Sequence, residues 1–170
     1  MPDGWKPLYA WAIVVLLHAA QTIYYYPRLP MVVAQHFSAS GQPNGWAPRE
    51  FFFVFSWLLL LGLSAIFTLA PRLLRRLPVS MINLPNRGYW LAPERKDASL
   101  RFLEEEMQWM GVLTVAFIVV VLHLAIRANL DPEHRLDNSV FVALLVGFLV
   151  ATVAWIARLY RRFPSPDSAK

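Results

Sequence analysis

Four long stretches of the chain carry no charged side chain and consist mainly of apolar residues. They cover residues 8–26, 51–70, 108–126 and 139–157 and are 19, 20, 19 and 19 residues long. A helix needs about 20 apolar residues to cross a hydrocarbon core of roughly 30 Å. Because none of the stretches alternates apolar and polar residues as a barrel strand does, the pattern predicts an all-α membrane protein with four transmembrane helices.

The three links between these helices differ in length. Residues 27–50 form a loop between the first two helices, residues 127–138 join the last two closely, and residues 71–107 form the longest link. We expect Pro71 to end the second helix, because a proline inside a helix removes a backbone hydrogen bond. The whole pattern predicts a single membrane domain over residues 1–170.

The longest link is expected to be structured. From Pro93 onward, apolar residues recur at helical spacing, which predicts an amphipathic helix that continues into the third transmembrane helix. These residues are Leu100, Leu103, Met107 and Met110. The apolar residues between Met81 and Leu91 predict a segment at the level of the lipid headgroups, so we expect residues 71–107 to be interfacial.

The distribution of lysine and arginine predicts the sidedness. With four spans, the amino terminus, residues 71–107 and the carboxyl terminus share one side of the membrane. That side carries all of the 16 Lys and Arg residues except Arg28, Arg49, Arg127 and Arg135. Because positively charged flanks are retained in the cytoplasm, we expect both termini there and residues 27–50 outside. Residues 17–20 make a poor cleavage site, so the first helix is expected to remain as an anchor.

The composition fits a lipid bilayer as the main partner. Apolar residues make up 57 % of the chain, compared with roughly 45–50 % in soluble domains. The net charge of +5 is concentrated outside the four stretches, so we interpret it as a topology signal and expect no nucleic-acid partner. The chain has no cysteine and no nucleophile or phosphate-loop motif, so we expect no enzyme activity, cofactor or metal.

Two histidines are the only ionisable groups in the four stretches apart from tyrosines. His18, with Gln21 one turn further, forms a polar stripe that can hydrogen-bond across the helices. A proton-sensitive or ligand-contacting role is the alternative. His123 lies nearer the outer end, at a depth that differs by roughly 7 Å from that of His18, so a shared metal would need offset helices. Asp131, His134 and Asp137 are a second metal candidate.

Small residues recur every four positions in the fourth helix, at Ala143, Gly147 and Ala151. Such a stripe lets another backbone approach closely. It predicts packing inside the bundle or, alternatively, contact with a membrane-protein partner or a second copy of the chain.

The first loop carries the most specific local pattern. Its prolines force an extended exit, Gly41 supplies a permissive backbone, and Asn44-Gly45 is typical of a tight turn. In order, the pattern comprises Leu29-Pro30, His36-Phe37, Gly41, Pro43-Asn44-Gly45-Trp46 and Arg49. It resembles the bacterial membrane domain of unknown function found in immunity proteins of the sporulation-delaying-toxin type, over about residues 8–70.

A second pattern lies in the long link. It consists of Asn83, Pro85, Asn86, Tyr89, Trp90, Pro93, Glu94 and Arg95, and it is similar to the cytoplasmic motif of short four-helix members of the same group. The resemblance implies a bacterial inner-membrane protein of the sensor or immunity-like kind, with a ligand-facing outer loop and a partner-facing cytoplasmic segment. The alternatives are an accessory subunit of a larger membrane complex and a metal- or proton-linked protein that uses His18 and His123.

Overall fold

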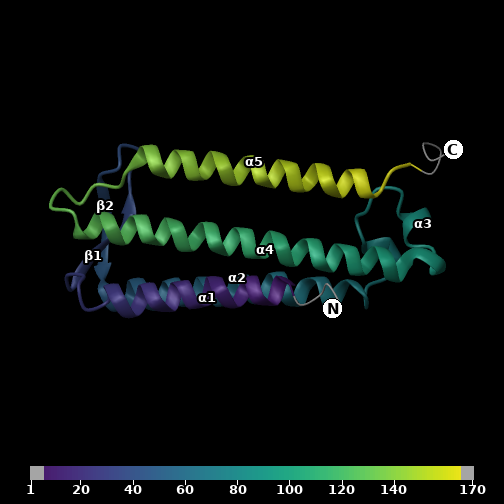
Figure 1. Ribbon diagram of the computed structural model, residues 1–170, viewed down its shortest axis with the longest axis horizontal. Helices are drawn as coiled ribbons and strands as arrows, with labels where there is room; N and C mark the ends of the chain where they lie inside the picture. The colour runs from purple at the N-terminus through teal and green to yellow at the C-terminus, as the bar shows by residue number, and fades with distance from the viewer. Residues whose placement is uncertain (1–5, 166–170) are drawn as a thin grey trace.

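The computed structural model describes residues 6–165 and is built almost entirely of helices (Figure 1). In chain order, the elements are α1 (Lys6–Tyr25), β1 (Val32–Phe37), β2 (Pro43–Pro48), α2 (Arg49–Leu74), the 3-10 turn η2 (Val79–Met81), α3 (Arg87–Trp90), α4 (Pro93–Leu130) and α5 (Asn138–Arg162). Four of these helices in the described chain are long and apolar enough to cross a membrane. The predicted fold class, an all-α membrane protein with four transmembrane helices, is confirmed.

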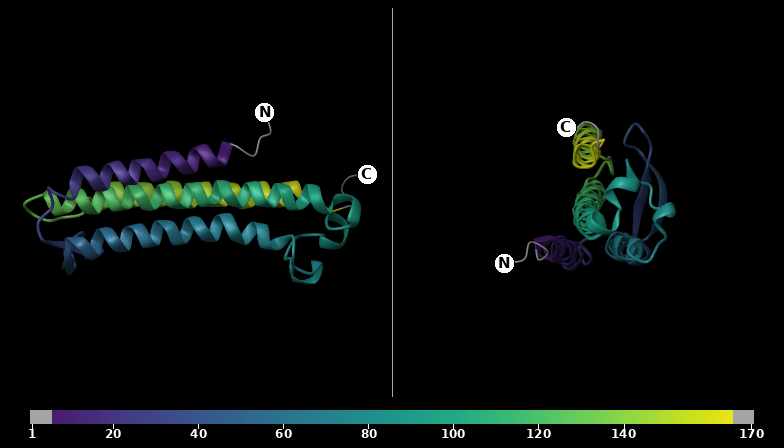
Figure 2. Two further views of the ribbon diagram at one scale, coloured as in Figure 1. Left: turned by 90° about the horizontal axis from the view of Figure 1, so that it is seen from below. Right: turned by 90° about the vertical axis from the view of Figure 1, so that its right-hand side faces the viewer.

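The four long helices lie side by side, with α4 between the others. Seen along the helix axes in Figure 2, α1 and α2 lie on one side of α4 and α5 lies on the other. We call the end of the molecule that carries the strands the hairpin end and the opposite end the α3 end (Figure 1). The first core cluster joins α1, α2 and α4 and contains Trp11, Val14, Leu60, Val112, Val115 and Val119.

One glycine allows this close packing. A Cβ atom at Gly111 of α4 would overlap the side chain of Phe67 and would lie 2.8 Å from the ring of Trp11. In a bilayer, helices gain packing energy from such close approach, because lipid tails are as apolar as the side chains. Gly111 therefore lets α4 act as the common neighbour of α1 and α2.

Two helices extend further than the apolar stretches alone suggest. The prediction that Pro71 ends the second helix is wrong, because Pro71 lies buried inside α2, which continues to Leu74. Membrane helices tolerate such a proline when neighbouring groups surround the interrupted backbone. The helix α4 begins with Pro93 in its first turn and is 38 residues long, or about 57 Å at 1.5 Å per residue. It therefore extends well beyond a hydrocarbon core of roughly 30 Å.

The loop at the hairpin end contains a small antiparallel sheet that the sequence analysis did not predict. Val32 pairs with Pro48, His36 with Gly45 and Phe37 with Pro43, with irregular register on either side of His36. The turn covers residues 38–42, where Ser38 N donates to Gln42 O at 2.8 Å. The prediction of a tight turn at Asn44-Gly45 is wrong, because both residues lie inside β2.

Candidate functional site

The residues of the two sequence motifs lie at the two ends of the molecule, for which we use two names. The hairpin cap consists of β1, β2, the turn at residues 38–42 and the loop at residues 131–137. The α3 module consists of residues 74–103 together with Phe163 and Pro164. Figure 1 shows these two parts at opposite ends of α4 and α5.

A hydrogen bond joins the two strands of the hairpin cap at its exposed surface. Nδ1 of His36 lies 2.7 Å from Oδ1 of Asn44. Because an amide oxygen only accepts hydrogen bonds, Nδ1 donates, which leaves Nε2 of the neutral ring as an unprotonated acceptor. Gly45 lies opposite His36, and a Cβ there would be only 3.0 Å from the His36 Cβ. The Asn44-Gly45 pair therefore accommodates the His36 side chain.

Trp46 is the largest exposed aromatic side chain of the hairpin cap. Half of its surface is exposed, and its ring meets His134 edge-on at a centroid distance of 5.6 Å. Phe37 is half-buried and packs against the second core cluster. Trp46 therefore rests on the α4–α5 loop, whereas Phe37 packs toward the interior of the molecule.

Arg49 closes the base of the hairpin cap. One of its terminal nitrogens donates to the carbonyl oxygens of Tyr26 at 3.0 Å and of Leu29 at 2.8 Å. Its guanidinium also lies over the Tyr26 ring at 4.5 Å. Leu29 is buried while the adjacent Pro30 is exposed, so the Leu-Pro pair and Arg49 together fix how the chain leaves α1 and enters α2.

Asn129 joins the hairpin cap to α4, a role that was not predicted from the sequence. It is 3 % exposed. Its Oδ1 accepts from Ala34 N at 2.6 Å, and its Nδ2 donates to Ala34 O at 2.8 Å and to Ala125 O at 2.9 Å. The side-chain amide therefore pairs with β1 as a neighbouring strand would. A polar residue at the end of an apolar run was the available signal.

The turn of the hairpin cap reaches across to α5. Gly41 has a φ of 80°, and its carbonyl oxygen accepts from Leu136 N at 3.0 Å. A Cβ at Gly41 would lie 2.5 Å from Leu136 O, so only glycine fits this contact. Asn138 Nδ2 also donates to Ala39 O at 2.6 Å.

Asp137 caps the first turn of α5. Its carboxylate accepts from Val140 N at 3.1 Å, from Ser139 Oγ at 2.8 Å and from Ser139 N at 3.0 Å. The hydrogen bond from Val140 N and those from Ser139 hold the pKa of this carboxyl below its usual range. The end of the α4–α5 loop is thus held by two sets of hydrogen bonds, from Leu136 to the hairpin turn and from the first turn of α5 to Asp137.

The α3 module holds the other end of α5. Phe163 is 2 % exposed and lies between the rings of Trp90 and Phe102, at centroid distances of 5.6 and 5.7 Å. Trp90 Nε1 donates to Pro164 O at 3.0 Å, and Asn86 Nδ2 donates to Phe163 O at 3.4 Å. Two residues of the second motif, Asn86 and Trp90, therefore contact the chain directly after α5.

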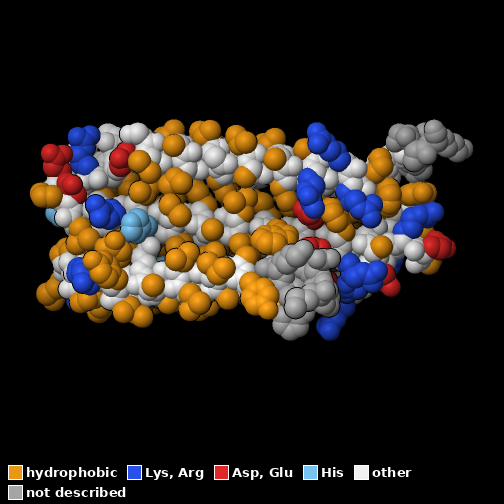
Figure 3. Space-filling view, in the orientation of Figure 1, with side chains coloured by type: hydrophobic (Ala, Val, Ile, Leu, Met, Phe, Trp, Pro, Cys, Tyr) orange, Lys and Arg blue, Asp and Glu red, His pale blue; other side chains and the backbone are white. Residues whose placement is uncertain are grey.

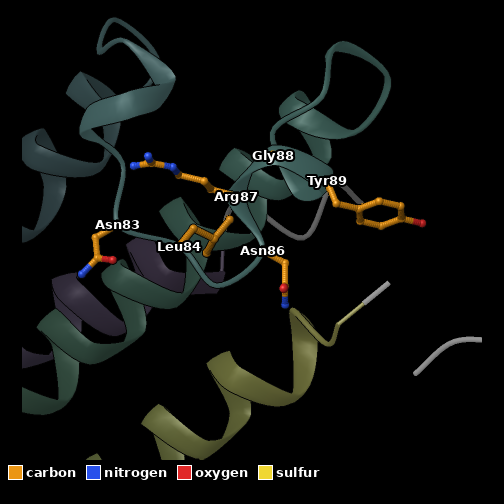
Figure 4. Close-up of a pocket in the computed structure, with 6 residues that line it drawn as sticks. All are labelled: Asn83, Leu84, Asn86, Arg87, Gly88 and Tyr89. Atoms are coloured by element: carbon orange, nitrogen blue, oxygen red, sulfur yellow. The ribbon is translucent and has the colours of Figure 1, made fainter. Parts of the chain in front are cut away.

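The other residues of the second motif form the surface of the α3 module. Arg95 lies over the Tyr89 ring at 4.0 Å. An open cavity of about 520 Å³ is lined by Asn83, Leu84, Asn86, Arg87, Gly88 and Tyr89 (Figure 4). Pro85 is half-buried, whereas Pro93 and Glu94 are exposed at the start of α4.

The intramembrane histidines have different neighbours. His18 is 1 % exposed, lies 4.6 Å from the Trp57 ring and has its Nε2 3.2 Å from Ser56 Oγ. Because Ser56 donates its only hydroxyl proton to Phe53 O, Nε2 of His18 is the donor in this pair. His123 instead lies 5.6 Å from the Tyr25 ring.

The neighbours of His18 and His123 bear on the alternative of a metal site between these two histidines. Gln21 is half-buried on the same helix as His18. His123 packs beside Tyr25, which lies seven residues, or about two helical turns, further along α1 than His18. Asp131 accepts from Glu133 N at 2.9 Å. Within residues 6–165, no group of three or more His, Cys, Asp and Glu side chains is placed to hold a metal ion.

A buried carboxylate ties α4 to α5 near the α3 end. Glu106 Oε1 accepts from Arg158 Nε at 2.7 Å, and the Glu106 carbonyl accepts from Trp155 Nε1 at 3.2 Å. Closer to the middle of the helices, the rings of Phe117 and Phe148 stack at 4.6 Å. None of these contacts was predicted from the sequence.

The small residues of α5 line open space. A Cβ at Gly147 would meet no atom within 4 Å, Ala143 is exposed, and Ala151 is half-buried. No residue of α5 itself is buried. Within the described chain, the stripe therefore does not bring another backbone close to Gly147.

Together, the fold and the two ends define a multi-spanning helical membrane protein. Residues 12–62 match the family described as "Domain of unknown function (DUF1648)". The matched region contains most of α1, the whole hairpin and the first half of α2, so it includes the entire first-loop motif. Neither the curated proteins nor the solved structures gave a match to this chain.

Proposed function

We propose that this chain is a non-enzymatic sensor or immunity-like protein of a bacterial inner membrane. In this proposal, both termini and the α3 module lie in the cytoplasm and the hairpin cap lies outside. The charge distribution supports this orientation, because lysine and arginine gather at the α3 end (Figure 3) and positive flanks are retained in the cytoplasm.

The observation that carries the proposal is that α4 and α5 connect the two ends of the molecule. At the hairpin end, Leu136 and Asn138 bond to the turn of the hairpin cap. At the α3 end, Phe163 is enclosed by the α3 module. A ligand that shifts the hairpin cap therefore also acts on the helix whose other end the module holds.

The exposed surface of the hairpin cap supports a peptide-like ligand. Met31, Val32 and Trp46 are each at least half exposed, and Nε2 of His36 is an acceptor at the same end. An apolar, aromatic surface beside a polar group suits an amphipathic peptide that approaches from the membrane surface. We propose that such a peptide is the signal or the toxin.

The test is a sensitivity assay in the native host. A strain that lacks the chain is exposed to a panel of membrane-active peptides and then complemented with wild type, Trp46→Ala or His36→Ala. We expect greater sensitivity of the deletion strain to at least one peptide, and we expect Trp46→Ala and His36→Ala to restore less protection than wild type. Trp109→Ala is the control, because Trp109 is an exposed tryptophan of α4 outside the hairpin cap. Equal growth of deletion and parent strains across the panel would contradict the proposal.

A second candidate function is that of an accessory subunit. It is favoured by α5, which has no buried residue along its 25 residues and lies only beside α4 among the long helices (Figure 2). The exposed Tyr89 of the α3 module offers a further contact. Purification of the untagged protein in mild detergent should then recover a stoichiometric partner, whereas a lone monomer at native expression would contradict this function.

A further inference from the structure

An apolar groove separates the middle parts of α4 and α5. Its volume is about 520 Å³, and its walls include Leu113, Phe117 and Val120 of α4 and Ala143, Gly147 and Phe148 of α5. Figure 3 shows apolar side chains along both sides of this seam. The groove therefore presents a lipid-facing surface that is concave.

At the hairpin end, the groove continues into a charged pocket. This pocket has a volume of about 350 Å³ and is lined by His123, Arg127, Asp131, Arg135 and Asp137, among others. Val140 lines both the groove and the pocket. On α4, the lining residues follow each other three or four positions apart from Leu113 to Asp131, so they lie on one helix face.

The charged groups of this pocket retain unused hydrogen-bonding capacity. Within residues 6–165, the Arg127 guanidinium makes no hydrogen bond or ion pair, and that of Arg135 makes one long bond, of 3.4 Å to Ser40 O. Asp131 and Asp137 each use one carboxylate oxygen, Oδ1, for local bonds. Two cations and two anions are thus available to a ligand.

We propose that the groove and the charged pocket bind one phospholipid of the phosphatidylethanolamine class. The phosphate lies at Arg127 and Arg135, the ammonium group lies at Asp131 and Asp137, and an acyl chain fills the groove. From Arg127 to Leu113, α4 rises about 21 Å, whereas one leaflet contributes about half of a roughly 30 Å core. The groove is therefore long enough for the acyl chain.

The charges select this headgroup over the other common ones. Guanidinium groups bind phosphate through several charge-assisted hydrogen bonds. A primary ammonium can donate to both carboxylates, whereas a choline headgroup has no N–H donor and a glycerol headgroup has no positive charge. The site uses the α4–α5 loop of the hairpin cap, but it includes none of Met31, Val32, His36 and Trp46, so it can be tested separately from the proposed sensing role.

The test is lipid retention by the full chain in mild detergent. The protein is mixed with equal amounts of phosphatidylethanolamine, phosphatidylglycerol and phosphatidylcholine, and bound lipid is counted by native mass spectrometry. We expect one phosphatidylethanolamine per chain to be retained at the highest collision energy that keeps the protein intact. Equal retention of the three lipids, or a dimer without bound lipid, would overturn the proposal.

Two matched pairs of variants locate the site. Gly147→Leu fills the groove, whereas Gly62→Leu adds the same side chain to an exposed position of α2 where a Cβ also meets no atom within 4 Å. Arg127→Gln removes the phosphate contact, whereas Arg28→Gln removes an exposed arginine that stacks on Tyr24 at the same end. We expect the groove and Arg127 variants to bind about tenfold more weakly, equivalent to about 1.4 kcal/mol, and both controls to bind as wild type. Equal losses within either pair would refute the location.

Discussion

The hydrogen bonds that join β1 to α4 come from a single side chain, that of Asn129. Replacing it with alanine removes three hydrogen bonds, two of which join its amide to the backbone N–H and C=O of Ala34. Ala34 is fully buried, so after the substitution neither backbone group has a partner within reach. Because a buried polar group without a partner costs about 1–3 kcal/mol, the two groups together cost about 2–6 kcal/mol.

This cost can be measured by equilibrium unfolding in mixed detergent micelles. The matched control is Asn138→Ala, which also removes an asparagine that bonds to the hairpin cap, through one bond to Ala39 O at the surface. We expect Asn129→Ala to lower the free energy of unfolding several times more than Asn138→Ala. Hydrogen exchange of the Ala34 amide should also become faster in Asn129→Ala.

A third variant separates hydrogen bonding from side-chain volume. Asn129→Asp keeps the shape, but an ionised carboxylate cannot donate to the carbonyl oxygens of Ala34 and Ala125. We expect it to destabilise the protein at least as strongly as alanine does. Equal stability of Asn129→Ala and Asn138→Ala would refute the reasoning.

Three further predictions concern the ends of α5. Because the pKa of Asp137 is lowered, the contribution of this carboxylate to stability is complete above the ordinary carboxyl value of 3.8 and is lost as the pH falls through the lowered pKa. Hydrogen exchange of the Val140 amide should therefore accelerate in acid. Phe163→Ala should cost about 3–5 kcal/mol, because it empties a buried aromatic position, and limited proteolysis should then cut within the α3 module. Gly41→Ala should loosen the turn of the hairpin cap, because both its positive φ and the Leu136 carbonyl exclude a Cβ, and exchange of the Leu136 amide should report this.

Each of these has its own control. Asp137→Asn should remove the acid dependence at Val140, and an unchanged pH profile in that variant would contradict the assignment. Tyr160→Ala removes an exposed aromatic ring close to Phe163, and it should leave the proteolysis pattern as in wild type. Gly88→Ala adds a Cβ where no atom lies within 4 Å, so an effect as large as that of Gly41→Ala would argue against the steric explanation.

The four long helices could be predicted from the sequence because the membrane imposes their length. A span must be apolar over about 20 residues, and the chain places every fixed charge outside four such stretches. The extension of α4 from Pro93 was also predictable, since a proline suits the first turn and helical spacing follows it. The continuation of α2 beyond Pro71 was not, because it depends on the neighbours that surround the proline.

The hairpin cap was harder to predict, because its turn and strands depend on contacts between distant residues. Asn44-Gly45 has the composition of a turn, yet Asn44 bonds to His36 and Gly45 gives room to the same side chain. Asn129 lies 95 residues from its partner Ala34. Single-sequence patterns carry no information about such pairings, and the same holds for Ser56 beside His18.

The way in which α5 is attached has a consequence for assembly of the protein. Most of the groups that hold its two ends, in the hairpin turn and in the α3 module, precede α5 in the chain and are synthesised before it. The first three long helices can therefore associate before α5 is complete, and α5 then joins them as a separate piece. We expect a chain divided within the α4–α5 loop to be reconstituted from two coexpressed fragments, whereas a break in the hairpin turn should prevent recovery.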